Sequence, residues 1–273
     1  MTNPYKIAGP ALISFSGGRT SGYMLHEILK AHDWRLPDDV RVCFANTGKE
    51  REETLQFVHE CETRWGVGIN WIEWRAGRPG FEQVSFDRAS RKGEPFEALI
   101  RLKQRLPNSH ERWCTQFLKV LPMFAFMRTD QNLEPGQYVE TIGLRDDEGE
   151  RIFKGLARAD SDGRHVAYPL AKMKVRKADV RAFWNAAPFD LGLEPWEGNC
   201  DLCFLKGKKI KKRIIRDSPS APIWWAAMET EQDGWFDKRD LVAEMMAAVD
   251  ASPELFDYDD EYDVECGLHC DAA

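Results

Sequence analysis

The sequence contains 273 residues, of which 43% are hydrophobic, 30% are charged and 11% are aromatic, and its formal net charge is −7. Ten Trp and fifteen Phe supply enough apolar surface for a core, which excludes a disordered chain, and the length allows one large domain or two small ones. No apolar run approaches the roughly 18–20 residues that a transmembrane helix needs, and the N-terminus lacks the pattern of a secretory signal. Seven cysteines are too few, and odd in number, for a disulfide scaffold. We therefore expect a cytoplasmic, non-membrane protein whose clustered thiols bind a metal or take part in catalysis.

Strands alternate with helices in the first third of the chain. Residues 11–15, 41–45 and Ile69–Trp74 are short apolar runs typical of buried strands, and residues 20–31 and 50–65 have the apolar spacing of helices. Such alternation implies parallel strands joined by right-handed crossovers. The predicted fold class is therefore α/β, with a doubly wound parallel sheet.

The rest of the chain predicts further elements of the same kind and then a change of pattern. The predicted elements are a mostly helical, basic stretch at 81–128, strands at 138–143 and 166–170, and a helix at 178–186. Beyond Pro188 come a pair of cysteines, a Lys-rich stretch, a Trp-rich helical region and an acidic tail. We expect a core domain at residues 1–190 and a cysteine-bearing C-terminal extension at residues 191–273.

The strongest functional signal is the sequence SFSGGRTSGYM at residues 14–24. A buried strand ends there, two glycines allow a tight turn, and hydroxyl residues follow where a helix begins. Backbone N–H groups at a helix N-terminus bind phosphate or sulfate, and nearby hydroxyls and a guanidinium add to this. An ordinary strand–helix turn is the alternative. The predicted phosphate-binding residues are Ser16, Gly17, Gly18, Arg19, Thr20 and Ser21.

Two more loops follow predicted strands of the same sheet. Thr47 and Gly48 follow the second strand, and Gly143 and Arg145 follow the fourth. Ligands of such sheets bind outside the carboxyl ends of the strands, so these residues are candidates for the same nucleotide site. Arg145 is a candidate anion clamp, and a solvated surface arginine is the alternative.

Three cysteines have the character of a metal or redox set. Cys200 and Cys203 form a CxxC pair, and Cys114 stands alone after Trp113. One CxxC is compatible with zinc, an iron–sulfur cluster or a redox dithiol. The Lys-rich stretch that follows would favour thiolates, although such runs are usually solvated helix faces.

The other four cysteines divide into two pairs. Cys43 lies on a predicted strand and Cys61 on the apolar side of a predicted helix, so we interpret both as core residues. Cys266 and Cys270 belong to the closing segment ECGLHC. A terminal cysteine beside Gly and His is either a swinging nucleophile or part of a chain end without function.

Together these motifs resemble the phosphoadenosine phosphosulfate (PAPS) reductase family, within the broader group of N-type ATP pyrophosphatases, or PP-loop proteins. The matching segments are SGGRTS, NTGKEREET, GLRDDEGER, the Tyr-Pro-Leu and Asp-Val pieces of residues 168–180, and ECGLH. The resemblance covers residues 11–190 and the tail. It implies a Rossmann-like sheet that binds an adenine nucleotide in residues 1–190, and it fits the family's diverged members, which are often phage-encoded.

In the reductases a tail cysteine attacks the sulfonate sulfur of an adenine sulfonucleotide. The resulting S-sulfocysteine is resolved by a thioredoxin-like reductant, which releases sulfite. The resemblance therefore assigns Cys266 as the nucleophile and the SGGRTS loop as the phosphosulfate site. Arg19 and Arg145 would neutralise the negative charge that a thiolate must approach.

The resemblance also implies a metal centre. Adenylyl-sulfate reductases hold a [4Fe-4S] cluster on a Cys-Cys pair and a CxxC, whereas here the first pair is Trp113-Cys114. This leaves Cys114, Cys200 and Cys203 as ligands, with Cys270 as the fourth, or Cys266 if the tail is not catalytic. Zinc is the alternative metal, and an iron with an open position is known in relatives that thiolate tRNA.

Three hypotheses follow. The first is a PAPS or adenylyl-sulfate reductase-like enzyme. The second is an ATP-dependent sulfur-transfer enzyme that acts on tRNA or DNA through an iron–sulfur cluster, with the Lys-rich stretch holding the polyanion. The third is a nucleotide- or metal-binding interaction module without turnover, suggested by Arg19-Thr20 where many relatives have Lys-Asp.

Overall fold

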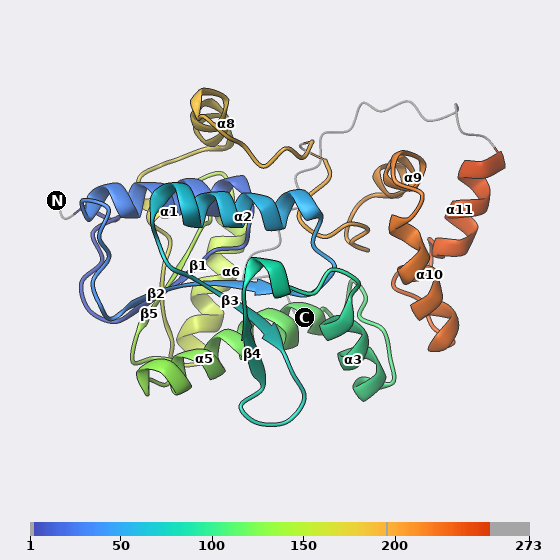
Figure 1. Ribbon diagram of the computed structural model, residues 1–273, viewed down its shortest axis with the longest axis horizontal. Helices are drawn as coiled ribbons and strands as arrows, with labels where there is room; N and C mark the ends of the chain where they lie inside the picture. The colour runs from blue at the N-terminus through green and yellow to red at the C-terminus, as the bar shows by residue number, and fades with distance from the viewer. Residues whose placement is uncertain (1–2, 195, 252–273) are drawn as a thin grey trace.

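A six-stranded sheet forms the centre of the computed structural model, which describes residues 3–194 and 196–251 (Figure 1). The spatial order is β4-β3-β2-β1-β5-β6. The strands are β1 (Ala11–Ser14), β2 (Val40–Asn46), β3 (Ile69–Trp74), β4 (Phe81–Val84), β5 (Val139–Ile142) and β6 (His165–Ala167). All neighbouring pairs are parallel except β3 and β4. The α/β, Rossmann-like fold class is thereby confirmed, and the strand order reverses between β1 and β5, where such sheets bind ligands.

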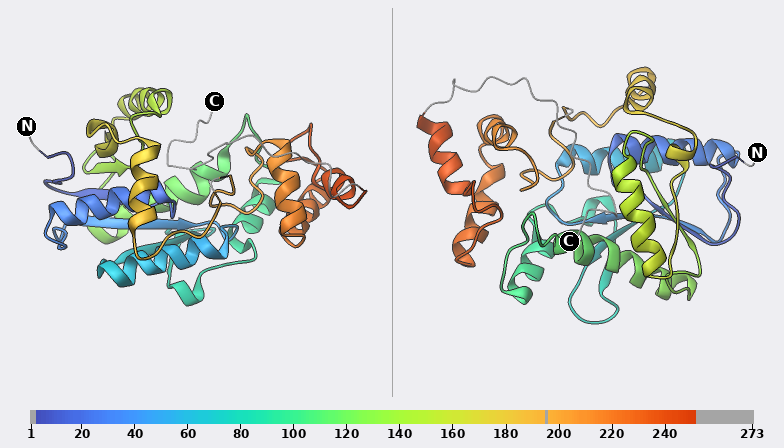
Figure 2. Two further views of the ribbon diagram at one scale, coloured as in Figure 1. Left: turned by 90° about the horizontal axis from the view of Figure 1, so that it is seen from above. Right: turned by 180° about the vertical axis from the view of Figure 1, so that it is seen from behind.

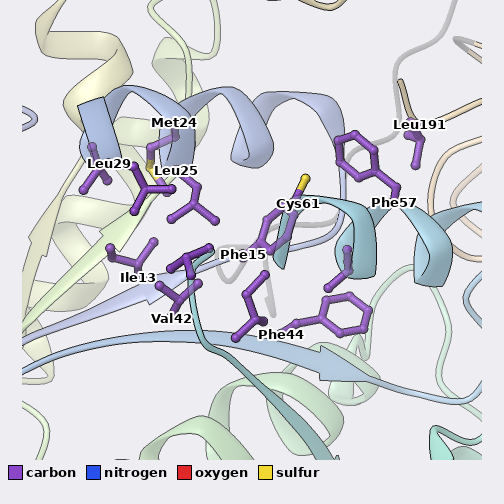
Figure 3. Packing of buried hydrophobic residues seen from close by; sticks show 14 of the residues in the cluster. Ile13, Phe15, Met24, Leu25, Leu29, Val42, Phe44, Phe57, Cys61 and Leu191 are labelled. Atoms are coloured by element: carbon purple, nitrogen blue, oxygen red, sulfur yellow. The ribbon is translucent and has the colours of Figure 1, made fainter. Parts of the chain in front are cut away.

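Helices cover both faces of this sheet (Figure 1). One face carries α1 (Arg19–Ala31), α2 (Glu52–Trp65) and α8 (Lys177–Ala186). The opposite face packs against α5 (Leu121–Gln131), with α6 (Gly149–Ser161) beside it. Figure 3 shows the first of these cores, in which apolar side chains of β1 and β2 meet those of α1 and α2.

A separate hydrophobic cluster lies beside the sheet, and Figure 2 shows its C-terminal helices gathered at one end of the molecule. It joins two distant parts of the sequence, because Phe96 and Trp113 pack with Trp225 and Phe236. Its helices are α3 (Glu94–Lys103), α4 (Trp113–Thr115) with the π-helical turn η2 (Gln116–Val120), α9 (Lys208–Asp217), α10 (Ala221–Glu231) and α11 (Val242–Ala251). The C-terminal extension therefore packs on the segment that precedes α5.

Two predicted elements differ from the structure. The stretch 81–128 is not helical from its start, because Phe81–Val84 forms the antiparallel edge strand β4 and the turn η1 (Phe86–Arg88) follows it. The strand predicted at 166–170 ends at Ala167. Pro169 has no N–H for a strand ladder and instead starts the short helix α7 (Pro169–Lys172). Within the described ranges, no helix combines the length and the apolar character needed to cross a membrane.

Candidate functional site

The SGG turn joins β1 to α1, and packing makes glycine necessary at its first position. Gly17 has a φ of +78°, and a Cβ there would lie 2.8 Å from Cγ2 of Thr54 on α2. The side chain of Ser21 holds the turn, because its Oγ accepts the backbone N–H of Ser16 at 3.2 Å and donates to the carbonyl of Gly18 at 3.0 Å. The turn therefore sets the N–H groups of the 13-residue helix α1 at the carboxyl end of β1.

Arg19 connects this turn to a distant segment. Its Nε donates to Oδ1 of Asp190 at 2.7 Å, and its Nη2 donates to the carbonyl of Leu193 at 2.8 Å. Burial pushes the pKa of Asp190 upward, but the hydrogen bonds from Arg19 and from backbone N–H groups outweigh it and lower the pKa below its ordinary value. Arg19 thus draws residues 190–193 against the start of α1.

A cavity of about 400 Å³ lies at this junction, within the size range of small-molecule sites. We call it the cationic cavity, because Arg19, Arg145, Lys177 and Arg181 line it together with the carboxylates of Asp190 and Glu194. Thr20 also lines it, whereas Ser16 and Ser21 line a smaller cavity beside Gly143. The structure therefore brings the SGG turn, the loop after β5 and the first turns of α8 to one place.

Arg145 is buried in this site rather than solvated. Its side chain donates to Oγ1 of Thr20 at 2.8 Å and to Oδ1 of Asp147 at 3.0 Å, and the residue is 6% exposed. The loop after β5 comes close to the start of α1 at Gly143, where a Cβ would lie only 3.1 Å from Cα of Ser21. A guanidinium held against the start of α1 adds positive charge where the helix N-terminus already favours anions.

The loop after β2 is held by Glu73, a residue that the sequence motifs did not single out. This carboxylate is fully buried and accepts hydrogen bonds from Nδ2 of Asn46 at 2.6 Å, from N and Oγ of Ser90 at 2.6 and 2.7 Å, and from Arg75 at 2.8 Å. Oδ1 of Asn46 in turn accepts the N–H of Gly48 at 3.1 Å. An acidic residue within the apolar run INWIEW was the signal available in the sequence.

Thr47 and Gly48 do not line the cationic cavity. Gly48 has a φ of +79°, and a Cβ there would lie 3.0 Å from Cα of Gly93, so this residue abuts the start of α3. Oγ1 of Thr47 donates to Oε2 of Glu50 at 2.8 Å, and Oε1 of the buried Glu50 lies 3.4 Å from Nζ of Lys119. Thr47 instead lines a second cavity.

That second cavity, which we call the thiol cavity, is lined by the three cysteines that the sequence analysis singled out. It measures about 20 Å³, room for about one water molecule. Besides apolar residues, its lining residues include two cationic, two hydroxyl-bearing and three thiol-bearing ones: Arg112, Lys119, Thr47, Thr115, Cys114, Cys200 and Cys203. Tertiary packing thus joins Cys114 of α4 to the CxxC segment.

The CxxC segment is hydrogen-bonded to both loops. Cys200 pairs with Glu50 in an antiparallel bridge, and the backbone N–H of Arg51 donates to the carbonyl of Asn199 at 2.8 Å. On its other side, Nδ2 of Asn199 donates to the carbonyl of Ser16 in the SGG turn at 2.7 Å. Asn199 therefore lies between the thiols and the predicted phosphate loop.

A buried ammonium stabilises this segment. Nζ of Lys206 donates to the carbonyls of Cys200 and Asp201, the latter at 3.2 Å. Burial lowers the pKa of Lys206, and the neighbouring Cys203 and Cys200 act in the opposite direction. A cation beside these thiols favours their thiolate forms.

The described thiols do not by themselves form a metal-binding group. Over residues 3–194 and 196–251, no group of three or more His, Cys, Asp or Glu side chains is arranged to hold a metal ion. Cys114, Cys200 and Cys203 share a cavity without forming such a group, and Cys266 and Cys270 lie outside the described residues. We derive no reaction step through a cluster or zinc.

Cys43 and Cys61 are core residues, as predicted. Both are fully buried, Cys61 between α2 and the sheet and Cys43 on the opposite face. Burial raises the pKa of each thiol above its ordinary value, so neither is a reactive thiolate at neutral pH.

Searches of known proteins give distant relatives. No protein-family model matches the chain. It is 29% identical over 203 residues to an uncharacterized nin region protein of Escherichia phage lambda. The aligned region covers 71% of this chain and 66% of that protein. It is also 29% identical over 140 residues to an uncharacterized protein of Methanocaldococcus jannaschii, which covers 51% of this chain and 24% of that protein. The matches thus span less than two thirds of either relative's length.

Among solved structures, the chain is similar to the U34-tRNA thiolase NcsA from Methanococcus maripaludis with its [4Fe-4S] cluster. The TM-score is 0.38 at 10% sequence identity, over 94% of this chain and 76% of that chain.

Proposed function

We propose that this protein is an adenine-nucleotide-dependent sulfur-transfer enzyme of the ATP pyrophosphatase type. The observation that carries the proposal is the position of the thiol cavity. Cys114, Cys200 and Cys203 line one small space, and Asn199 connects the CxxC segment directly to the SGG turn. Thiols held next to a predicted phosphate loop favour chemistry that uses both sulfur and a nucleotide.

The nucleotide phosphates would bind at the start of α1. The N–H groups of Gly17 and Gly18, the hydroxyl of Thr20 and the guanidinium of Arg145 would supply hydrogen-bond donors and positive charge there. An oxygen of the acceptor attacks the α-phosphorus of ATP, and pyrophosphate leaves. The acceptor then carries AMP, a good leaving group.

The cavity thiols would deliver the sulfur. A persulfide on one thiol, formed by transfer of the terminal sulfur of an external persulfide donor that is left as a thiol, attacks the activated carbon through its terminal sulfur, and AMP leaves. A second cavity thiol then attacks the first cysteine's sulfur, which releases the thiolated acceptor and leaves a disulfide. A thioredoxin-like dithiol reduces that disulfide. Lys206 would favour the thiolate forms that these attacks need.

Sulfonucleotide reduction is the second candidate, and the tail sequence ECGLH is the observation that favours it. In that reaction the Cys266 thiolate attacks the sulfonate sulfur, the nucleotide phosphate leaves, and a thioredoxin-like reductant releases sulfite. The iron–sulfur cluster implied by the family resemblance would use Cys114, Cys200, Cys203 and Cys270. Three of these thiols line the thiol cavity, and sulfur carriage is the function that we propose for them.

The deciding experiment compares Cys200→Ser and Cys266→Ser with the unmodified chain. Pyrophosphate release from ATP, sulfite release from PAPS or adenylyl sulfate, and thiolation of added tRNA or DNA are measured. We expect Cys200→Ser to lose thiolation while retaining ATP binding, with Cys61→Ala as the cysteine control away from both cavities. Sulfite release that disappears in Cys266→Ser would establish the reductase instead, and nucleotide binding without any turnover would establish an interaction module.

A broad brown absorbance of the anaerobically purified protein, lost in Cys200→Ser, would also contradict sulfur carriage. It would assign the cavity thiols to an iron–sulfur cluster.

A further inference from the structure

The Lys-rich segment after the CxxC pair divides into an inner and an outer set. Lys206 and Lys211 are buried, and Nζ of Lys211 lies 2.8 Å from Oδ2 of Asp240. Nζ of the exposed Lys208 lies 2.9 Å from Oδ1 of the same aspartate. Lys208 and Lys211 therefore tie α9 to the segment before α11, whereas Lys206 holds the CxxC segment.

The outer set lies along the other side of α9 and consists of Lys209, Lys212, Arg213 and Arg216, which we call the cationic stripe. Their positions are separated by three, one and three residues, which places all four on one helix face. Ile210 and Ile214 are buried on the opposite face. Asp217 ends the helix and pairs with Arg213 at 3.6 Å and with Arg216 at 2.7 Å.

The stripe is connected to the cationic cavity. The guanidinium of Arg213 lies over the ring of Trp196, 4.2 Å from its centroid. Trp196 belongs to the segment between α8 and α9, in which Glu194 and Gly198 line the cavity together with Arg181 of α8. Figure 1 shows this segment running from α8 to α9. A ligand on the stripe would therefore lie beside the proposed nucleotide site.

The net charge of −7 is not spread evenly along the sequence. Residues 252–273 contain eight Asp and Glu and no Lys or Arg, so residues 1–251 contain 37 acidic side chains against 38 Lys and Arg. The negative charge of the chain is thus concentrated in its last 22 residues. The part that carries the stripe is close to neutral overall and locally basic.

We propose that the cationic stripe binds the phosphodiester backbone of a nucleic acid, and that this nucleic acid is the sulfur acceptor. The identity of the acceptor rests on the proposed function, whereas binding to the stripe does not. Seven residues of helix rise span about 10 Å, the length of about three phosphate steps along one strand of a duplex. Contacts of this kind are independent of sequence and sensitive to salt.

The test measures binding of a fluorescein-labelled RNA hairpin to the full chain by fluorescence anisotropy, without nucleotide, over a series of KCl concentrations. The variant Lys209→Gln/Lys212→Gln/Arg216→Gln keeps good helix formers on α9. We expect its affinity at low salt to fall by about tenfold or more, and the slope of log affinity against log salt to shrink by about 2 to 3. The single change Lys209→Gln should reduce the slope of log affinity against log salt by about 0.9.

The matched control is Lys6→Gln/Lys30→Gln/Arg35→Gln, which removes three exposed cations at the far end of α1. It should bind the hairpin as the unmodified chain does. Equal losses in both triple variants, or a stripe variant within twofold of the unmodified chain, would overturn the proposal. ATP binding by calorimetry in the same proteins tests the proposed function separately, and we expect the stripe variant to bind ATP unchanged.

Discussion

Single buried side chains hold the two loops that face the cavities. Glu73 accepts four hydrogen bonds and thereby ties Asn46 to Ser90 across two strand ends. A buried carboxylate is stable only when its oxygens are satisfied by such donors. Arg145 is the corresponding residue on the other side of the site, where it is bound to Thr20 and Asp147.

Glu73→Gln should destabilise the protein, because an amide nitrogen cannot accept the bonds that one carboxylate oxygen now accepts. We expect the free energy of unfolding in urea to fall by about 2–4 kcal/mol. The control is Glu82→Gln, since Glu82 also accepts from Arg75, at 2.8 Å, but its side chain is 40% exposed. It should cost less than about 1 kcal/mol. Equal losses in the two variants would show that burial of Glu73 is unimportant.

At the scale of elements, the SGG turn depends on its close packing against α2 and β2. A Cβ on Gly17 would meet Thr54 at 2.8 Å and Val58 at 3.1 Å, both on α2, and Phe44 of β2 at 3.0 Å. The short apolar runs predicted the parallel strands well, because a buried strand carries its signal within a few residues. The edge strand β4 was missed, since its four residues FEQV are half-buried and mostly polar.

Gly17→Ala should therefore cost more than a positive φ alone. We expect a loss of about 2–4 kcal/mol in the free energy of unfolding, from left-handed backbone strain and from crowding against α2. Gly66→Ala is the matched control, because Gly66 has a φ of +61° and a Cβ added there would have no other atom within 4 Å. It should cost about 1 kcal/mol. A Gly17 variant as stable as the Gly66 variant would mean that the SGG turn can move away from α2 at little cost.

At the scale of the whole molecule, a buried ion pair joins the sheet to a distant turn. Glu140 of β5 is fully buried, and both of its oxygens accept from Nη1 of Arg164, at 3.1 and 2.8 Å. Burial raises the pKa of Glu140 from 4.5 to about 7, and the attraction of Arg164 opposes that rise. The folded state therefore binds a proton more tightly than the unfolded chain does.

Stability should consequently fall as the pH rises from about 4.5 to about 7. The contribution of Glu140 is complete below the unfolded pKa and is lost as the pH passes the folded pKa, at most about 3 kcal/mol in all. Urea unfolding at pH 5 and pH 8 should show this loss as a lower free energy of unfolding at pH 8. In Glu140→Gln, the free energies of unfolding at the two pH values should differ by less. If the free energy of unfolding changed equally between pH 5 and pH 8 in both proteins, Glu140 would be ionised over this whole pH range.

The sequence by itself determined the α/β class, the SGG turn at a strand end, and the core positions of Cys43 and Cys61. These features depend on patterns within a few residues, such as apolar runs, glycine pairs and helical spacing. The roles of the tail cysteines Cys266 and Cys270 stay predictions, because both residues lie outside the described residues.

Only the tertiary structure decided which functional residues meet. It joined Cys114 to the CxxC pair in one cavity, placed Thr47 in the lining of that cavity, and buried Arg145 against Thr20. It also separated the Lys-rich segment into buried lysines and the cationic stripe. The physical reason is that these contacts join segments far apart in the chain, and only the packing of the sheet with its helices brings such segments together.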